Sequence, residues 1–169
     1  PLSVWLLNSH SQLGVFEAGI SQKGEMQALH NIIRPTIAVL TNIGSAHEEN
    51  FSSAEEKCRE KLRLFKGAQV MVYNADDEMV TRILNETEHK GERLAWSVKS
   101  HDAAMRITKI DKQPTHTTIH YIYKGGEPNC FSLPFIDDAS VCNSIICATV
   151  GLHLGFDAST LNLLMSKLE

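Results

Sequence analysis

Short apolar runs alternate with segments of helical periodicity through the first 100 residues of the chain. The apolar runs have the length of β-strands and lie at 13–18, 37–42, 69–73 and 94–98. Between them, helical patterns cover residues 25–33, 53–66 and 74–85. Strands separated by helices of this length favour right-handed crossovers and parallel pairing. The alternation therefore predicts an α/β fold, with a mostly parallel sheet covered by helices on both faces.

The pattern changes after residue 100. Residues 104–110 and 115–123 alternate apolar and polar side chains in the manner of half-exposed antiparallel strands, and Gly125-Gly126 makes a turn into 129–135. Two helical segments, at 138–154 and 158–168, follow. These features predict a small antiparallel sheet appended to the parallel one. We divide the chain into a parallel α/β part at 1–100, antiparallel strands at 101–136 and closing helices at 137–169.

Composition excludes several classes of function. The net charge is −4 and no basic run occurs, so nucleic acid is not an expected partner. No stretch approaches the ~18 consecutive apolar residues of a membrane span. The four cysteines form no C-x-x-C pair, which is typical of reduced thiols in a cytoplasmic protein. The chain opens on Pro1 without a methionine, and we expect it to be a piece of a longer polypeptide.

Two of the predicted strands lead into side chains that can bind a cation. Glu17 follows the first apolar run and precedes Ala18-Gly19, and His47 lies a few residues beyond the second run. Functional groups of open parallel sheets gather at the carboxyl ends of the strands. Each residue also has a simpler interpretation: Glu17 as an acid facing water at a strand end, and His47 as a surface histidine.

Lys61 occupies an unusual place on the helix predicted over 53–66. With about 100° per residue, it falls inside the apolar stripe, whereas Lys57 lies mostly outside it; the stripe consists of Ala54, Cys58, Leu62 and Phe65. Such a lysine either extends its amine to water or keeps it partly desolvated with a lowered pKa. An amine of the second kind can react with CO₂ to give a carbamate, which is an anion able to bind metal.

Other polar groups give weaker signals. His116 and His120 lie in a threonine-rich run that fits a strand and not a zinc-binding helix. Asn74, Asp76 and Asp77 are explained most simply as the cap of a helix. The phosphate-binding motif G-x-x-x-x-G-K-[ST] occurs nowhere in the chain. The chain by itself therefore lacks the phosphate cradle that a nucleotide enzyme of this architecture needs.

Several motifs, taken in order, resemble those of the Mur ligases, the ATP-dependent amide-bond-forming enzymes of peptidoglycan synthesis. The segment 16–26 resembles the strand and loop that follow the P-loop in the central domain of that family. Residues 41–51 are similar to the second motif, 57–65 to the lysine helix, and 74–77 to the strand end after it. Residues 139–143 resemble a later motif with two asparagines; here Ser140 replaces the first, and Asn143 is kept.

The resemblance implies a role for each candidate residue. Glu17 would bind a Mg²⁺ ion shared with the ATP phosphates. His47 and Lys61, the latter as a carbamate, would hold a second Mg²⁺. Asn143 would contact the adenine of ATP, although Ser140 puts the contact made by the first asparagine in doubt.

The resemblance also implies a reaction and its partners. The motifs are most similar to those of family members that join D-Ala-D-Ala to UDP-MurNAc-tripeptide. By this resemblance the piece begins just after the P-loop and lacks the remaining domains of its full-length chain, which would bind the UDP-sugar and present the incoming amine. We therefore expect the isolated 169 residues to be inactive. Two alternatives stay open: a related ligase with another acceptor and amine, or a non-catalytic α/β interaction module.

Overall fold

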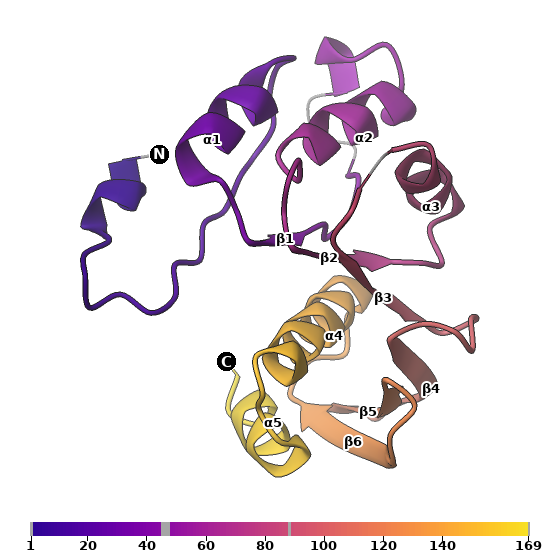
Figure 1. The fold of residues 1–169 in the computed structure, drawn as a ribbon. Coiled ribbons are helices and arrows are strands. Elements are labelled where there is room, and N and C mark those ends of the chain that lie inside the picture. The colour runs from indigo at the N-terminus through magenta and orange to yellow at the C-terminus, as the bar shows by residue number, and fades with distance from the viewer. Residues whose placement is uncertain (1, 45–47, 88, 169) are drawn as a thin grey trace.

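Six strands form one mixed sheet in the computed structural model, which describes residues 2–44, 48–87 and 89–168 (Figure 1). Their order in the sheet is their order in the chain: β1 Ile37–Val39, β2 Val70–Asn74, β3 Glu92–Ser97, β4 Met105–Lys112, β5 Thr117–Tyr123 and β6 Pro128–Leu133. The pairs from β1 to β4 are parallel, and the pairs β4–β5 and β5–β6 are antiparallel. The predicted α/β class, with a mostly parallel sheet and an antiparallel end, is confirmed.

Helices cover both faces of this sheet (Figure 1). One face carries α1 Glu25–Ile33, α2 Ala54–Arg63 and α3 Glu78–Asn85, and the other carries α4 Asp138–His153 and α5 Ala158–Met165. Two short 3₁₀ helices, η1 Leu2–Leu6 and η2 Glu48–Asn50, complete the elements of the described residues.

The strand β2 shows why the sheet needs helices on both sides. Its side chains alternate between two apolar cores, as the period of a strand requires. Val70 and Val72 belong to the core under α4 and α5, whereas Met71 and Tyr73 belong to the core under α2 and α3. All four side chains are buried. The continuous apolar run in the sequence reflects this burial on both faces.

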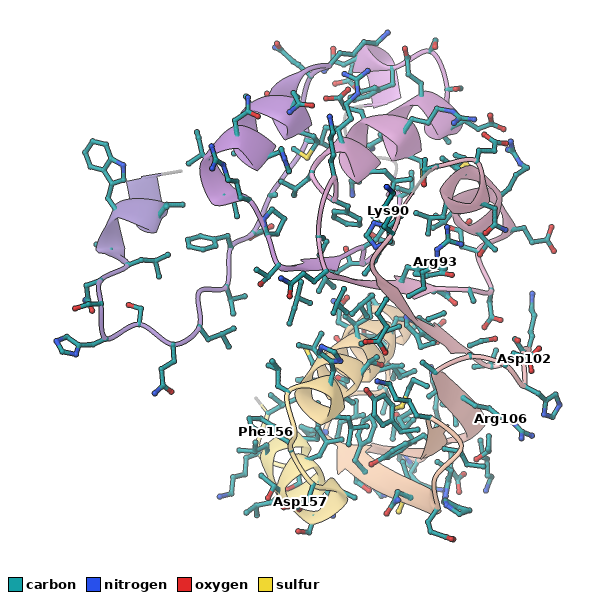
Figure 2. All side chains as sticks on the ribbon, in the orientation of Figure 1. Lys90, Arg93, Asp102, Arg106, Phe156 and Asp157 are labelled. Carbon is teal, nitrogen blue, oxygen red and sulfur yellow. The ribbon has the colours of Figure 1, made fainter. Side chains whose placement is uncertain are left out.

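Side-chain caps fix where the helices of the parallel half begin and end. Ser53 Oγ accepts a hydrogen bond from the Glu56 N–H at 3.1 Å, which starts α2, and Asp77 caps α3 in the same way. Arg93 of β3, labelled in Figure 2, donates to the carbonyl oxygen of Leu84 at 2.8 Å and so closes the end of α3. These bonds satisfy backbone groups that a helix terminus leaves without a partner.

Asp76 has a different function from the helix cap expected for it. Its carboxylate accepts hydrogen bonds from the hydroxyl of Ser97 and from the N–H of Val98, the latter at 2.8 Å. Asp76 therefore joins the chain after β2 to the end of β3. The capping prediction holds for Asp77, whose Oδ1 accepts from the Val80 N–H at 3.0 Å.

The prediction of a strand over residues 13–18 is wrong. This segment is irregular, and the side chains of Leu13 and Val15 are 62% and 87% exposed. Within the described ranges, β1 is an edge strand that pairs only with β2. An extended segment becomes a strand only when a neighbour satisfies its N–H and C=O groups, and none of the strands in the described part of the chain pairs with residues 13–18.

The antiparallel strands are part of the main sheet and do not form a separate one. The residue pair Trp96 and Met105 joins β3 to β4 in parallel register, and β5 and β6 continue from there. Both halves contribute to the core under α4 and α5. The sheet is therefore continuous from Ile37 to Leu133.

Candidate functional site

A cavity of about 290 Å³ lies beyond the carboxyl end of β1, where two loops face the helix α2. Its lining consists of Gly19, Ile20, Ser21, Asn42, Gly44, Lys57 and Lys61. Open parallel sheets bind their ligands beyond the carboxyl ends of their strands, because the loops there diverge from the strand ends. The two lysine side chains give the cavity its charged groups.

The first loop of this cavity is held by side chains from α1 and η2. Glu25 Oε2 accepts hydrogen bonds from the backbone N–H groups of Ser21 and Gln22, at 2.6 and 2.9 Å. Asn50 Nδ2 donates to the carbonyl oxygen of Ser21 at 2.9 Å. Because Glu25 lies in the first turn of α1, the helix dipole also favours its negative charge. The wall formed by residues 19–21 is thus anchored on both sides.

The second loop is held by two lysines on successive turns of α2. Lys57 Nζ donates to the carbonyl oxygen of Gly44 at 2.6 Å, and Lys61 Nζ donates to that of Asn42 at 2.9 Å. Residues four apart on a helix share one face, so both amines reach the same segment. The segment after β1 is therefore docked on α2 through main-chain oxygens.

Lys61 is the lysine of this cavity whose amine has a lowered pKa. Its side chain is half-buried, and burial, together with the nearby charge of Lys57, lowers the pKa of its amine from the ordinary value of 10.5. This agrees with the second of the two expectations for Lys61, a partly desolvated amine. A lowered pKa increases the fraction of neutral amine, which is the form that attacks an electrophile.

The prediction that Lys57 lies outside the buried stripe is wrong. Only 2% of Lys57 is exposed, and Glu60 on the same helix is 4% exposed. Glu60 Oε1 accepts a hydrogen bond from the backbone N–H of Gly24 at 2.7 Å, and Arg63 pairs with its other oxygen at 2.9 Å. Because α1 and the loop after β1 both pack against α2, the helix buries more than the single face counted from its periodicity.

The structure does not gather all the predicted site residues around this cavity. Glu17 is exposed on the irregular segment before the first loop, two residues from the lining residue Gly19. His47 lies outside the described residues. Asn143 is exposed on α4, whose first turn is tied to the end of β4 by an ion pair of 2.6 Å between Lys112 and Asp138. Since β4 runs parallel to β3, that turn lies toward the carboxyl ends of the parallel strands, as the cavity does.

The groups of the cavity fit Mg²⁺ only after a chemical change. No cluster of three or more His, Cys, Asp and Glu side chains occurs among the described residues. The main-chain oxygens of Asn42 and Gly44 are of the type that Mg²⁺ prefers, but each now accepts from a lysine amine. Conversion of Lys61 to a carbamate replaces a cationic donor by two oxygen ligands. In that form the carbamate oxygens and the carbonyl oxygen of Asn42 would be ligands of the kind that fits a magnesium ion, while Gly44 stays bound to Lys57.

Comparison with known proteins identifies the family. Residues 4–151 match the model of the Mur ligase middle domain. The chain belongs to the Mur ligase family. Members are ATP-dependent ligases that join an acid to an amino acid. The resemblance read from the motifs is confirmed by this match.

The Mur ligase relatives extend well beyond this chain. The chain is 27% identical over 159 residues to the UDP-N-acetylmuramoyl-tripeptide–D-alanyl-D-alanine ligase of Bacillus subtilis, which covers 92% of the chain and 33% of that protein. It is 33% identical over 78 residues to the enzyme of the same name from Rickettsia prowazekii, covering 44% of the chain and 17% of that protein. The chain thus spans about a third or less of these relatives.

Solved structures agree on the fold. The structure is similar to MurF from Acinetobacter baumannii with a TM-score of 0.82 and 21% identity, over 96% of this chain and 36% of that one. It is similar to MurF from Thermotoga maritima in complex with ADP with a TM-score of 0.72 and 19% identity, over 88% of this chain and 34% of that one. At these identities the likeness establishes the Mur ligase fold. None of the helices in the described ranges combines the length and apolar character needed to cross a membrane.

Proposed function

We propose that this chain is the central part of a ligase that joins D-Ala-D-Ala to UDP-MurNAc-tripeptide at the expense of ATP. The observation that carries the proposal is the half-buried amine of Lys61, held over the carbonyl oxygen of Asn42 in the cavity at the sheet edge. The curated relatives named above support the choice of substrates, and the ADP complex of a structural relative supports the choice of nucleotide.

In this proposal Lys61 acts after modification by CO₂. Its neutral amine attacks the carbon of CO₂, a nitrogen–carbon bond forms, one carbon–oxygen π bond becomes a carboxylate, and a proton leaves the nitrogen for water. The lowered pKa of the amine favours the attacking form at neutral pH. The product places two oxygens beside the carbonyl oxygen of Asn42, where a lysine ammonium stood before.

The other predicted residues complete the proposed site. Lys61 as a carbamate and His47 would hold one Mg²⁺, and Glu17 would hold another shared with the phosphates of ATP. Magnesium in this position neutralises the negative charge that develops on phosphoryl and acyl oxygens. Asn143, which is exposed at the start of α4, would contact the adenine of ATP.

The proposed reaction has two steps. The γ-phosphoryl group of ATP is transferred to the carboxylate of the UDP-MurNAc-tripeptide, which gives an acyl phosphate and ADP. The amine of D-Ala-D-Ala then attacks the acyl carbon, and the tetrahedral intermediate expels phosphate with loss of a proton from nitrogen. The four cysteines are free thiols, which supports a cytoplasmic setting for these steps.

Bicarbonate labelling tests the modification of Lys61 in the 169-residue chain. With ¹³C-bicarbonate at mildly alkaline pH, we expect a carbamate carbon signal in the NMR spectrum that disappears in Lys61→Met. The matched control is Lys66→Met, which removes an exposed lysine just after α2 and should keep the signal. An identical spectrum for Lys61→Met and the wild type would contradict the proposal for this residue.

A substrate panel tests the reaction itself. We expect the isolated chain to show no ATP hydrolysis dependent on D-Ala-D-Ala, because the P-loop motif is absent from it. A protein that carries this chain together with the other parts present in its Mur ligase relatives should release phosphate with D-Ala-D-Ala and UDP-MurNAc-tripeptide. Turnover only with another amino acid would indicate a related Mur ligase, and no turnover with any pair would indicate a non-catalytic module.

A further inference from the structure

Lys57 is the unexpected residue of the candidate site. Among the lysines and arginines of the described residues, it alone is buried, with 2% of its surface exposed. Burying an ammonium group is costly unless the group is well paired, and a methionine of similar length would fill the same space at lower cost. The presence of a charge here therefore calls for an explanation in terms of what the charge holds.

The position of Lys57 relative to Lys61 supplies that explanation. The two side chains hold neighbouring carbonyl oxygens of one loop, Gly44 at 2.6 Å and Asn42 at 2.9 Å. Gly44 is the last described residue before the segment that contains His47. The two contacts are equivalent in kind, but the residues that make them differ in exposure, since Lys57 is buried and Lys61 lines the cavity half-buried.

Use of Lys61 in the proposed function would remove one of these two contacts. A carbamate nitrogen carries no positive charge, and its new carboxylate repels the carbonyl oxygen of Asn42. The loop would then depend on Lys57. We propose that Lys57 is a positioning residue that keeps residues 42–44 docked on α2 while Lys61 is modified. This inference rests on the proposed function, because the second contact is needed only if the first is given up.

Backbone dynamics of the 169-residue chain test this division of roles. The measured quantities are the ¹⁵N order parameters of the Ile43 and Gly44 amides, which are about 0.85 in rigid backbone and below about 0.6 in flexible backbone. We expect high values in the wild type and in Lys61→Met, because Lys57 still holds Gly44. In the double variant Lys57→Met/Lys61→Met both contacts are lost, and the values should fall to the flexible range.

The effect of bicarbonate on the loop order parameters distinguishes a positioning role of Lys57 from a merely structural one. In Lys57→Met the loop should be ordered without bicarbonate and become as flexible as in the double variant when bicarbonate is added. The wild type should stay ordered under both conditions. The control Lys66→Met removes an exposed lysine whose side chain makes no hydrogen bond or ion pair with the described residues, and it should behave as the wild type.

Three outcomes would overturn the assignment of Lys57. The first is a loop that stays ordered in the double variant, and the second is a loop that is as flexible in Lys61→Met as in the double variant. The third is a loop in Lys57→Met whose order parameters do not change with bicarbonate although the wild type shows the carbamate signal. Absence of that signal in the wild type would instead overturn the proposed modification of Lys61. The comparison of Lys61→Met with the double variant would still decide whether Lys57 holds the loop.

Discussion

Glu60 on α2 accepts a hydrogen bond from the backbone N–H of Gly24, 36 residues earlier in the chain, at 2.7 Å. Gly24 is the N-cap residue of α1 and makes no side-chain cap of its own. The carboxylate of a second helix thus satisfies an N–H group at the start of the first. This contact joins α1 and α2 directly beside the candidate cavity, whose wall at Ser21 is anchored by the same turn of α1.

Removal of the Glu60 carboxylate should destabilise the fold. We expect Glu60→Ala to lower the free energy of unfolding by about 1–3 kcal/mol, because the Gly24 N–H loses its acceptor in a partly buried site. Glu60→Gln keeps one acceptor oxygen and should lose about 1 kcal/mol or less. Urea unfolding followed by circular dichroism measures both. Equal unfolding midpoints for Glu60→Ala and the wild type would show that water replaces this contact without loss.

The backbone of Gly24 gives a second prediction. Its φ is +91°, and a Cβ built there meets no atom within 4 Å, so a substitution is opposed by conformation alone. We expect Gly24→Ala to cost about 1–2 kcal/mol of stability, the penalty for an L-residue in left-handed geometry. Gly19 is the matched control, since its Cβ also meets open space and its φ lies outside that region. Gly19→Ala should change thermal stability by less than about 0.5 kcal/mol.

Lys61 should make the free energy of unfolding depend on pH in the alkaline range. Its pKa is lowered by burial and by Lys57, so between the folded pKa and 10.5 the unfolded chain binds more protons at this residue. Lys61 therefore contributes stability that is present above 10.5 and is lost as the pH falls through the folded pKa. The difference in unfolding free energy between the wild type and Lys61→Met should increase with pH across this window. A difference that stays constant with pH would contradict the lowered pKa.

The cysteines should differ in reactivity according to burial. Cys58 on α2 is fully buried, and burial raises the pKa of its thiol to about 11. Cys130 on β6 is exposed. Because the thiolate is the reacting form, iodoacetamide at pH 8 should label Cys130 first and Cys58 last. Peptide mass spectrometry over time measures the order. Comparable labelling rates for the two residues would indicate that α2 opens readily in the native chain.

Most of the fold was predictable because it rests on local pattern. The positions of α2 and β2 follow from periodicity, and Ser53 and Asp77 each cap a helix by accepting from the N–H three residues later. The same pattern failed at residues 13–18, where an apolar run has the composition of a strand. Whether such a run pairs depends on a neighbouring strand, and that information is not contained in the run itself.

The candidate site was predictable only in part, for a similar reason. The apolar stripe of α2 correctly indicated that Lys61 is half-buried. It could not indicate that Lys57 and Glu60 are buried as well, because the groups that cover them, the loop at Gly44 and the turn at Gly24, come from 13 and 36 residues away. A lysine and a glutamate three apart on a helix look like an ordinary solvated face.

The packing of α4 has a consequence for anyone who wishes to shorten this chain. The helix lies late in the sequence, yet it shares a core with Val72 and Leu94 of the parallel strands and with Ile119 of the antiparallel ones. A truncation after residue 100 would strip the shared cover from one side of β2 and β3 and leave their apolar side chains in water. The change of pattern at residue 100 therefore marks no boundary between separate units: β4 still pairs in parallel with β3, and the strand direction reverses only at β5, so residue 100 is an unsuitable place to cut.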